Sequence, residues 1–368
     1  MKAARSITIG APPARNPSSG IGWIGPLTQW APLAIVLAIL IVAPAFLSEF
    51  RMSLLAKFLT YAIVALAIDL VWGYAGMLTL GHGVFFGLGG YAMAMYLKQE
   101  SSQDNLPDFM SWSGLSTMPV FWEPFAHPWF AIPMAAIIPA ALAGGLCYLV
   151  VRSRITGVYF SLITQALALI VSILFIGAQP FTGGTNGITN FQTIFGFPLI
   201  LDETRMGLYY STIVVFVVAY LLCRWTVTSR FGTLLVALRD DENRVRFFGY
   251  DPVRLKVFVF ALSAGISGIA GALFTAQVGI ISPAMMGIVP SIEMVVWVAV
   301  GGRGTLMGAV IGAILVSSAK SGFSEAFPDL WQAVFGAMLV GSVVFLPQGV
   351  AGAVKSAILL AQNRLKKA

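Results

Sequence analysis

Long apolar runs place the strongest limit on how this chain can fold. One of them reads "VFVFALSAGISGIAGALF", and hydrophobic residues make up 58% of the sequence while charged residues make up 10%. A soluble domain usually carries about 25% charged residues and alternates apolar with polar positions. Apolar runs longer than about 18 residues can cross roughly 30 Å of hydrocarbon as helices, whereas a membrane β-barrel shows short alternating segments. The sequence therefore predicts an all-α integral membrane protein, a polytopic transmembrane helical bundle.

The apolar runs predict about ten spanning or near-spanning segments. We expect them at residues 31–48, 58–77, 82–97, 129–151, 157–177, 208–224, 257–278, 288–302, 304–320 and 330–347. The first thirty residues contain Pro, Ser and Arg and no continuous apolar core, so residues 1–30 are expected to form a cytoplasmic tail rather than a signal peptide. Residues 31–348 would then form the membrane domain, and residues 349–368 a second cytoplasmic tail.

The basic residues are distributed unevenly among these segments. If the N-terminus is cytoplasmic, the outer segments hold only five of the 22 basic residues, which are Arg51, Lys57, Lys98, Arg205 and Lys320. Cationic loops resist translocation, so this bias predicts that both termini lie in the cytoplasm. The net charge of +7 follows from this topology and gives no reason to expect nucleic acid as a partner.

One stretch, "SRFGTLLVALRDDENRVRFFGYDPVRLK" at residues 229–256, collects many of the charges of the chain. It joins two apolar runs on the predicted cytoplasmic side. Asp240 or Asp241 can cap a helix, Gly249 can end it, and Asp251, which precedes a proline, can start the next helix. Apolar side chains stand beside the charges between these caps. The stretch is therefore either a solvated inner loop or a short helix that docks into a cleft on another protein.

The sequence offers little for enzyme or cofactor chemistry. A nucleotide-binding P-loop needs a Gly-Lys pair, and none occurs in this sequence. His82 and His127 are the only histidines, too few for a multi-histidine metal site, and Cys147 and Cys223 fall inside or at the end of apolar runs. We expect no catalytic residue, metal, cofactor or structural disulfide. If ATP drives this protein, a separate chain must hydrolyse it.

Two acidic residues lie within predicted spans, Asp69 in "LAIDLVWGYAG" and Glu293 in "PSIEMVVW". A charge inside a membrane span costs about 2.5–3.5 kcal/mol, so such residues usually face protein or water. They either line a solute pathway or bond to neighbouring backbone. Glycines crowd the segment after Asp69, which indicates either close helix packing or a discontinuous segment in which Tyr74, Thr79 and His82 present polar groups.

Three more polar residues complete the candidate pathway. Tyr159 and Gln165 lie in "GVYFSLITQALALI", and Asn186 lies in the outer "GGTNGI", where it either forms a turn or contacts solute near an outer gate. None of these groups offers the paired cation and anion that would capture a zwitterion. A neutral, amide-rich solute needs only hydrogen-bond donors and acceptors and is compatible with them.

The charged stretch and the helix after it resemble the permease subunits of ABC importers of the branched-chain amino-acid type, whose relatives include monosaccharide permeases. The similarity extends through "GYAGMLTLGHGVFFGLGGYAMAMYL", "GVYFSLITQAL", "FTGGTNGI" and "GGRGTLMGAVIGAIL" and covers about residues 58–345. It implies an ABC importer permease fold in a bacterial inner membrane. The implied partners are a homologous second permease subunit, two ABC ATPase subunits and an extracytoplasmic substrate-binding protein.

The resemblance also implies that residues 239–249 form a coupling helix that seats in a groove of the ATPase subunit, with Gly249 as the motif glycine. The acidic-Ala-Ala opening common in the family is replaced here by "LRDDE". The residues expected to take part are Arg239, Asp240, Asp241, Glu242, Arg244, Arg246, Phe247, Phe248 and Gly249.

Within this family, "LGHGVFFGLGGYAMAMYL", "NLPDFM" and "FWEPF" look most like the urea-type branch, and specifically like the second permease subunit of urea importers. That resemblance implies import of urea or a short-chain amide. One alternative is a branched-chain amino-acid permease subunit of the same architecture. A passive urea or amide channel would need no ATPase, and an ion-coupled secondary transporter would depend on the proton gradient.

Overall fold

The computed structural model describes residues 26–102, 105–155, 157–327, 333, 336–337, 341 and 349–352. The chain divides into two compact units, residues 1–42 and 43–368. The first contains helix α1 (Pro26–Val42), which is apolar and carries Pro32 in its interior. The predicted tails and the predicted span at 330–347 fall mostly outside the described residues.

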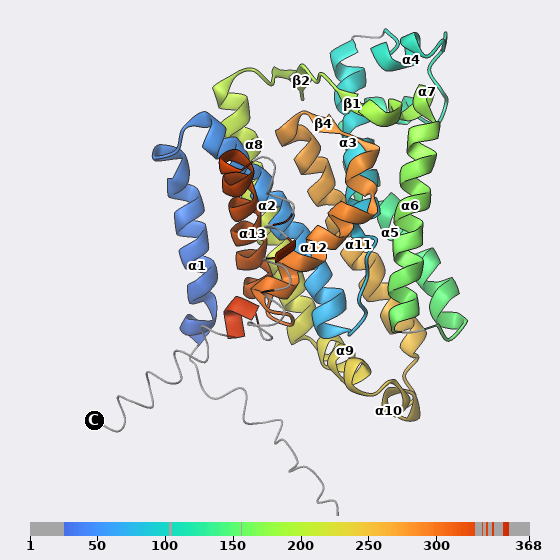
Figure 1. Cartoon of the computed structure of the whole chain (residues 1–368), viewed down its shortest axis with the longest axis vertical. Coiled ribbons are helices and arrows are strands. Elements are labelled where there is room, and N and C mark those ends of the chain that lie inside the picture. The colour runs from blue at the N-terminus through green and yellow to red at the C-terminus, as the bar shows by residue number, and fades with distance from the viewer. Residues whose placement is uncertain are drawn as a thin grey trace, which may run out of the picture. The chain divides into compact units, whose positions relative to one another are not determined.

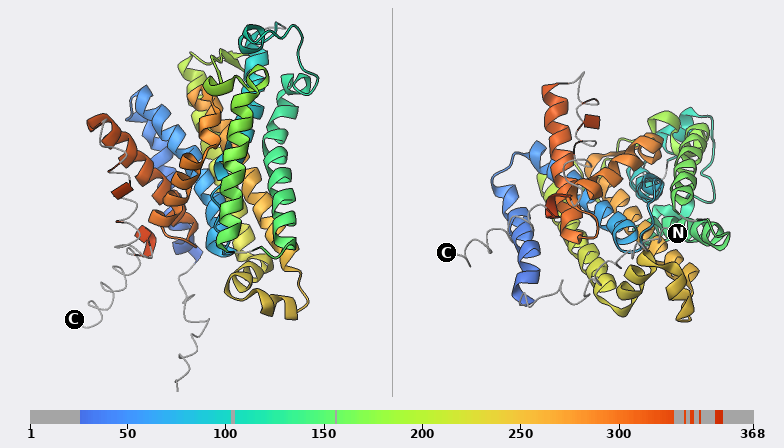
Figure 2. Two further views of the ribbon diagram at one scale, coloured as in Figure 1. Left: turned by 45° about the vertical axis from the view of Figure 1, so that its right-hand side comes forward. Right: turned by 60° about the horizontal axis from the view of Figure 1, so that its bottom comes forward.

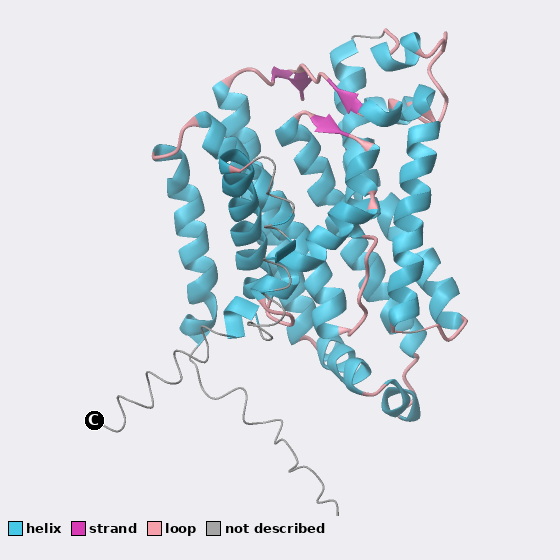
Figure 3. Ribbon diagram, in the orientation of Figure 1, coloured by secondary structure: helices cyan, strands magenta, loops and turns pink. Residues whose placement is uncertain are grey.

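Helices make up most of the second unit (Figure 3). The long ones are α2 (Glu49–Asp69), α3 (His82–Ser102), α5 (Pro128–Arg152), α6 (Val158–Gly177), α8 (Asp202–Thr228), α11 (Pro252–Val278), α12 (Ile288–Gly301) and α13 (Leu306–Ala326). Shorter helices are α4 (Asp108–Trp112), α7 (Gln179–Thr182), α9 (Arg230–Asp240) and α10 (Glu242–Phe247). Short strands β1 (Ile188–Thr189) and β4 (Ile280–Ile281) pair antiparallel, as do β2 (Thr193–Ile194) and β3 (Phe197–Pro198).

The sequence-based expectation of about ten spans is not confirmed. Among the described residues, six helices are long and apolar enough to cross a membrane: Glu49–Tyr74, Pro128–Arg152, Val158–Gly177, Asp202–Thr228, Pro252–Val278 and Leu306–Glu325. The expected spans at 31–48 and 288–302 correspond to shorter apolar helices. The expected span at 82–97 forms α3, whose glycines and polar residues make it less apolar. Most of α3 is buried by neighbouring protein, so it does not need a uniformly apolar surface.

Helix α2 lies at the centre of the second unit, and α6 lies at its periphery. In its most apolar window 78% of α2 is buried, against 28% for α6. Small residues bring α3, α5 and α11 close together around this centre. A Cβ atom at Gly271 on α11 would overlap the carbonyl oxygen of Phe86 on α3, and one at Gly268 would overlap that of Ala135 on α5. This close backbone approach is the role that glycine commonly plays between membrane helices.

The glycine-rich segment after Asp69 contains a break in helical structure. Helix α2 ends in a π-helical turn, η3 (Leu70–Tyr74), and the chain is non-helical from there until α3 begins at His82. Gly76 has a φ of 75°, a left-handed conformation that suits glycine. The discontinuous segment, one of the two alternatives that the sequence allowed, is therefore present, and glycines on both sides of it also allow close helix packing. We call residues 70–81, the π-helical turn and the non-helical segment after it, the break in α2.

The second unit has two distinct ends (Figures 1 and 2). The two short helices α9 and α10 lie at one end, and the strands with α4 and α7 lie at the other. Long helices connect the two ends. The charged stretch is thereby separated from the loops that the basic-residue bias assigns to the outside.

Candidate functional site

The charged stretch folds into two helices rather than one. The backbone turns between α9 and α10 at Asp241, whose side chain caps α10 by accepting hydrogen bonds from the amides of Asn243 (3.0 Å) and Arg244 (3.3 Å). Gly249 follows α10 with a φ of 84°. Asp251 caps α11 through the amide of Val253 (2.9 Å). The predicted start and end signals are confirmed, because each depends on local backbone geometry.

Helix α10 presents an apolar and basic surface, which we call the α10 patch: Arg244, Arg246, Phe247 and Phe248. Phe247 is 91% exposed and Phe248 81% exposed. Helix α10 is anchored, because Val245 is buried and Glu242 pairs with Lys256 of α11 at 2.6 Å. Within the helix, Glu242 also pairs with Arg246 at 3.1 Å, and the capping Asp241 pairs with Arg244 at 3.0 Å. Two large aromatic side chains are therefore exposed on an anchored short helix.

Arg239 belongs to α9, and its side chain, 33% exposed, reaches the π-helical turn at the end of α2, unlike the residues of the α10 patch. Its Nη1 donates a hydrogen bond of 2.8 Å to the carbonyl of Gly73 in the π-helical turn. A Cβ atom at Gly76 would meet the Arg239 side chain. Asp240 is exposed and lies beside the Arg239 guanidinium at 3.3 Å. The charged stretch therefore contacts the break in α2 directly.

Asp69 is fully buried just before the same break. One carboxylate oxygen accepts a 2.6 Å hydrogen bond from the amide of Gly304, in the loop between α12 and α13. The other has no hydrogen-bond partner among the described residues. Arg303 of that loop lies over the Trp72 ring, 5.5 Å from its centroid. Asp69 thus joins the π-helical turn to a neighbouring loop, and Tyr74 lies half-buried at the end of the turn.

His82 is a fully hydrogen-bonded core residue. The Ser263 hydroxyl donates to the carbonyl of Ala67 (2.6 Å), so it accepts from His82 Nε2 (2.9 Å). His82 Nδ1 then accepts from the Thr79 hydroxyl at 2.8 Å. This chain of bonds fixes the start of α3 against α11 and α2. It does not leave a polar group of His82 directed at a solute.

Two side chains of α6 hold the non-helical segment from another side. The Ser161 hydroxyl donates to the carbonyl of Leu78 (2.8 Å), and the Leu80 amide donates to the Thr164 hydroxyl (3.0 Å). Gln165, the next residue on α6, is half-buried. Tyr159 is 71% exposed. The segment therefore connects the charged stretch to α6, whereas Tyr159 stands apart from these contacts.

Glu293 lies in a separate cavity of about 250 Å³ lined by residues of α2, α12 and α13. Both of its carboxylate oxygens accept from the Lys320 ammonium, at 2.9 and 2.7 Å. Lys57 and Ser317 also line this cavity. The sequence offered no cation to pair with Glu293 among the candidate residues; α12 and α13 bring Lys320 to it from 27 positions further along the chain.

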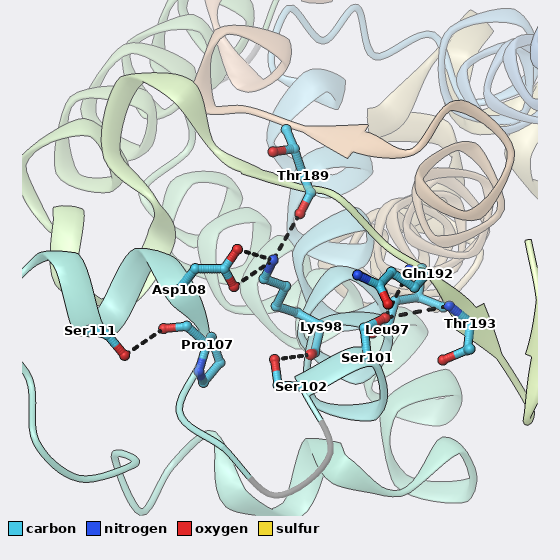
Figure 4. Close-up of polar contacts among 10 residues, drawn as sticks. All are labelled: Leu97, Lys98, Ser101, Ser102, Pro107, Asp108, Ser111, Thr189, Gln192 and Thr193. Atoms are coloured by element: carbon cyan, nitrogen blue, oxygen red, sulfur yellow. Dashed lines mark hydrogen bonds and ion pairs between the residues drawn. The ribbon is translucent and has the colours of Figure 1, made fainter.

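Asn186 is exposed at the opposite end from α10 and lines a cavity of about 230 Å³ together with Lys98 and Asp108. Figure 4 shows the ammonium of Lys98 between the Asp108 carboxylate (2.8 Å) and the carbonyl of Thr189 (3.2 Å). Lys98 is 5% exposed at its side chain. Partial burial would raise the pKa of Asp108, but the hydrogen bond and positive charge of Lys98 outweigh burial and lower it.

The seven predicted pathway residues do not form one site. Asp69 and Tyr74 adjoin the break in α2, and His82 belongs to the core just beyond it. Gln165 is close along α6 to the contacts with that segment, whereas Glu293 and Asn186 line two different cavities. Sequence reasoning missed Lys57 and Lys320 because it assigned them to outer loops. Both lie at the edge of a predicted span, and a basic residue at such a position is the signal that could have identified them.

Comparison with known proteins identifies the family. Residues 50–343 match the family described as branched-chain amino acid transport system / permease component. The high-affinity branched-chain amino acid transport system permease protein LivM of Salmonella typhimurium is 25% identical over 340 residues, covering 86% of this chain and 74% of LivM. BraD, a permease protein of the same description from Pseudomonas aeruginosa, is 24% identical over 304 residues, covering 80% and 92%.

The high-affinity branched-chain amino acid transport system permease protein LivH of Salmonella typhimurium is 22% identical over 306 residues, covering 80% of this chain and 91% of LivH. No solved structure matches the chain. The family match covers well over half of the sequence, and the expectation of a membrane permease rather than an enzyme is confirmed. The chain belongs to the family of permease components of branched-chain amino acid transport systems.

Proposed function

We propose that this chain is one membrane subunit of an ATP-driven importer and that it carries branched-chain amino acids. The observation that carries the proposal is the similarity to LivM over 86% of the chain, since LivM is named for branched-chain amino acid transport. The urea-type assignment remains a prediction from short segments of the sequence. It is the second candidate, and the relatives favour the amino-acid reading.

The α10 patch is proposed to dock onto an ATPase subunit. The chain contains no P-loop Gly-Lys pair, so a motor would have to be a separate polypeptide. Exposed Phe247 and Phe248 would fill an apolar groove, and Arg244 and Arg246 would meet acidic side chains at its rim. In this proposal the end with α9 and α10 is cytoplasmic, in agreement with the basic-residue bias.

The remaining partners are proposed from the relatives. LivM and LivH of Salmonella typhimurium are each named as a high-affinity branched-chain amino acid transport system permease protein, and both are similar to this chain. This supports pairing with a homologous second permease. Two ATPase subunits and an extracytoplasmic binding protein would complete the importer, in a bacterial inner membrane with both termini inside. Closure of the ATPases would move α10 and α9 and switch access to the solute path.

Charge reversal in the α10 patch tests this proposal. The double variant R244E/R246E should abolish leucine uptake while the protein remains in the membrane at normal abundance. The matched control is Arg254→Glu, because Arg254 is also an exposed arginine paired with the capping aspartate of a helix, at 3.2 Å, but lies outside the patch. R254E should retain uptake.

Two results would contradict the proposal. Uptake that survives R244E/R246E would favour a passive channel, which needs no ATPase. Uptake that stops when the proton gradient is collapsed while ATP is maintained would favour an ion-coupled transporter.

A further inference from the structure

The transport proposal above assigns no role to the residues that line the cavity between α2, α12 and α13. It combines ionic groups of both signs with an apolar wall. Its volume of about 250 Å³ is far above the roughly 10–15 Å³ that one water molecule requires. Lys57, Glu293, Ser317 and Lys320 contribute polar groups to it, and Leu54, Phe58 and Tyr61 contribute apolar surface.

Lys57 is the first sign that the cavity takes a ligand. No described carboxylate lies within ion-pair distance of its ammonium, which instead lies over the Tyr61 ring, 5.9 Å from the centroid. Its charged electrostatic neighbours are Lys320 and Glu293, which already bond to each other. An ammonium on a membrane-spanning helix is costly unless it finds a partner. Lys57 therefore has capacity for an anion.

Ser317 gives a second, independent sign. Its side chain is 3% exposed, and its hydroxyl oxygen has no hydrogen-bond partner among the described residues. A buried hydroxyl without a partner costs about 1–3 kcal/mol. Ser317 lines the same cavity as Lys57. A ligand carboxylate that reaches both groups can accept from the hydroxyl and from the ammonium.

The rest of the cavity provides for the other parts of an amino acid. The Glu293 carboxylate can accept from a ligand ammonium in addition to Lys320, since two carboxylate oxygens have about four acceptor positions. Tyr61 stacks on Trp297 with centroids 4.6 Å apart and on Phe274 at 5.7 Å, so its ring is a supported wall. Leu54 and Phe58 extend the apolar surface next to it.

We propose that this cavity binds a zwitterionic amino acid with an apolar side chain. Lys57 and Ser317 hold the carboxylate, Glu293 holds the ammonium, and the side chain lies against Tyr61 and Phe58. This inference rests on the proposed function, for which it names a substrate-binding place. It also gives the Glu293–Lys320 pair a role, because Lys320 holds the Glu293 carboxylate in position.

The test uses the full chain with its partner permease and ATPase subunits, purified in phosphatidylcholine nanodiscs without a binding protein. The measurement is the apparent Kd from thermal unfolding with leucine, leucinamide and 4-methylpentanoate. Leucine should bind best. Leucinamide lacks the carboxylate and 4-methylpentanoate lacks the ammonium, so each should bind at least about ten-fold more weakly.

Two variants and a matched control make the test specific. K57Q and S317A should weaken leucine binding, K57Q by about ten-fold or more, because it removes a charge-assisted hydrogen bond. Arg51→Gln removes a positive charge from an exposed position near the start of the same helix and should leave the Kd unchanged. S317A removes a single hydroxyl, so it keeps the test informative if K57Q fails to fold.

Equal leucine binding by wild type and both variants would overturn the inference, as would leucinamide binding as tightly as leucine. Stabilisation by phosphatidylglycerol that K57Q removes, without any response to leucine, would identify a lipid phosphate as the anion and would also overturn it. Normal leucine uptake by cells carrying K57Q would contradict the proposed binding site but not the proposed importer function. Leucine uptake that does not need this chain would instead contradict the importer function itself.

Discussion

At the scale of single residues, backbone groups stabilise several of the buried or partly buried ionic side chains. Asp69 accepts from the amide of Gly304, Lys98 donates to the carbonyl of Thr189, and Arg239 donates to the carbonyl of Gly73. Burying an ionic group costs several kcal/mol unless hydrogen bonds replace its water. Each of these bonds joins two segments that are far apart in sequence, so each charge also fixes the position of a loop.

Asp108→Asn tests the Lys98–Asp108 ion pair, at the end opposite α10. It removes the negative charge next to Lys98, whose ammonium is almost fully buried. We expect the free energy of unfolding to fall by about 1 kcal/mol, a value already reduced because the Asp108 side chain is 38% exposed and partly screened by solvent. Thermal unfolding of the purified protein measures this change. Glu123→Gln, at an exposed carboxylate of the same outer region, is the control and should be neutral.

The same pair should depend on pH in a defined direction. The pKa of Asp108 is lower in the folded protein than its usual value. Its contribution to stability is therefore fully present above the unfolded pKa of about 3.9 and is lost as pH falls through the folded value. The difference in stability between wild type and D108N should shrink below about pH 4. A difference that persists unchanged at lower pH would contradict the assigned pair.

Local signals were predictable at the residue scale, and distant partners were not. The caps at Asp241 and Asp251 and the left-handed Gly249 follow from a few neighbouring residues. The partners of Glu293 and Arg239 are 27 and 166 positions away along the chain. Only the packing of whole helices brings such groups together, so the sequence could name these side chains as candidates but could not assign their contacts.

At the scale of elements, the break in α2 connects the charged stretch to the membrane interior. Arg239 of α9 bonds to Gly73, and α6 bonds to the next residues of the chain through Ser161 and Thr164. A movement of α9 would therefore be transmitted to α6 by the non-helical segment of the protein that both helices contact, and not by lipid. The crowding of glycines in the sequence indicated either such a break or close helix packing. Only the tertiary contacts could decide between these two alternatives.

Arg239→Gln tests this connection. The variant loses the charge-assisted hydrogen bond to Gly73, so we expect leucine uptake to fall by about ten-fold or more while ATP hydrolysis by the partner subunits continues. The measurement is the ratio of solute transported to ATP hydrolysed in proteoliposomes. Arg230→Gln, at the exposed start of the same helix, is the control and should keep the wild-type ratio. Equal loss of hydrolysis and uptake in R239Q would instead indicate a failure of assembly.

At the scale of the whole molecule, the second unit separates two kinds of surface. The α10 patch is exposed at one end, and the strands with the Lys98–Asp108 pair lie at the other. This separation fits an importer that receives solute on one side of the membrane and a motor on the other. The all-helical membrane class was predictable from apolar runs alone. The expected number of spans is not confirmed, because among the described residues α3 and α12 are helices whose length or polarity departs from that of a simple span.

The most direct test of the central claim is uptake of labelled leucine and labelled urea, each at micromolar concentration, by cells with and without this chain. We predict that removing the chain abolishes ATP-dependent leucine uptake and leaves urea uptake unchanged. Loss of urea uptake alone, with leucine uptake intact, would contradict the amino-acid assignment and support the urea-type branch.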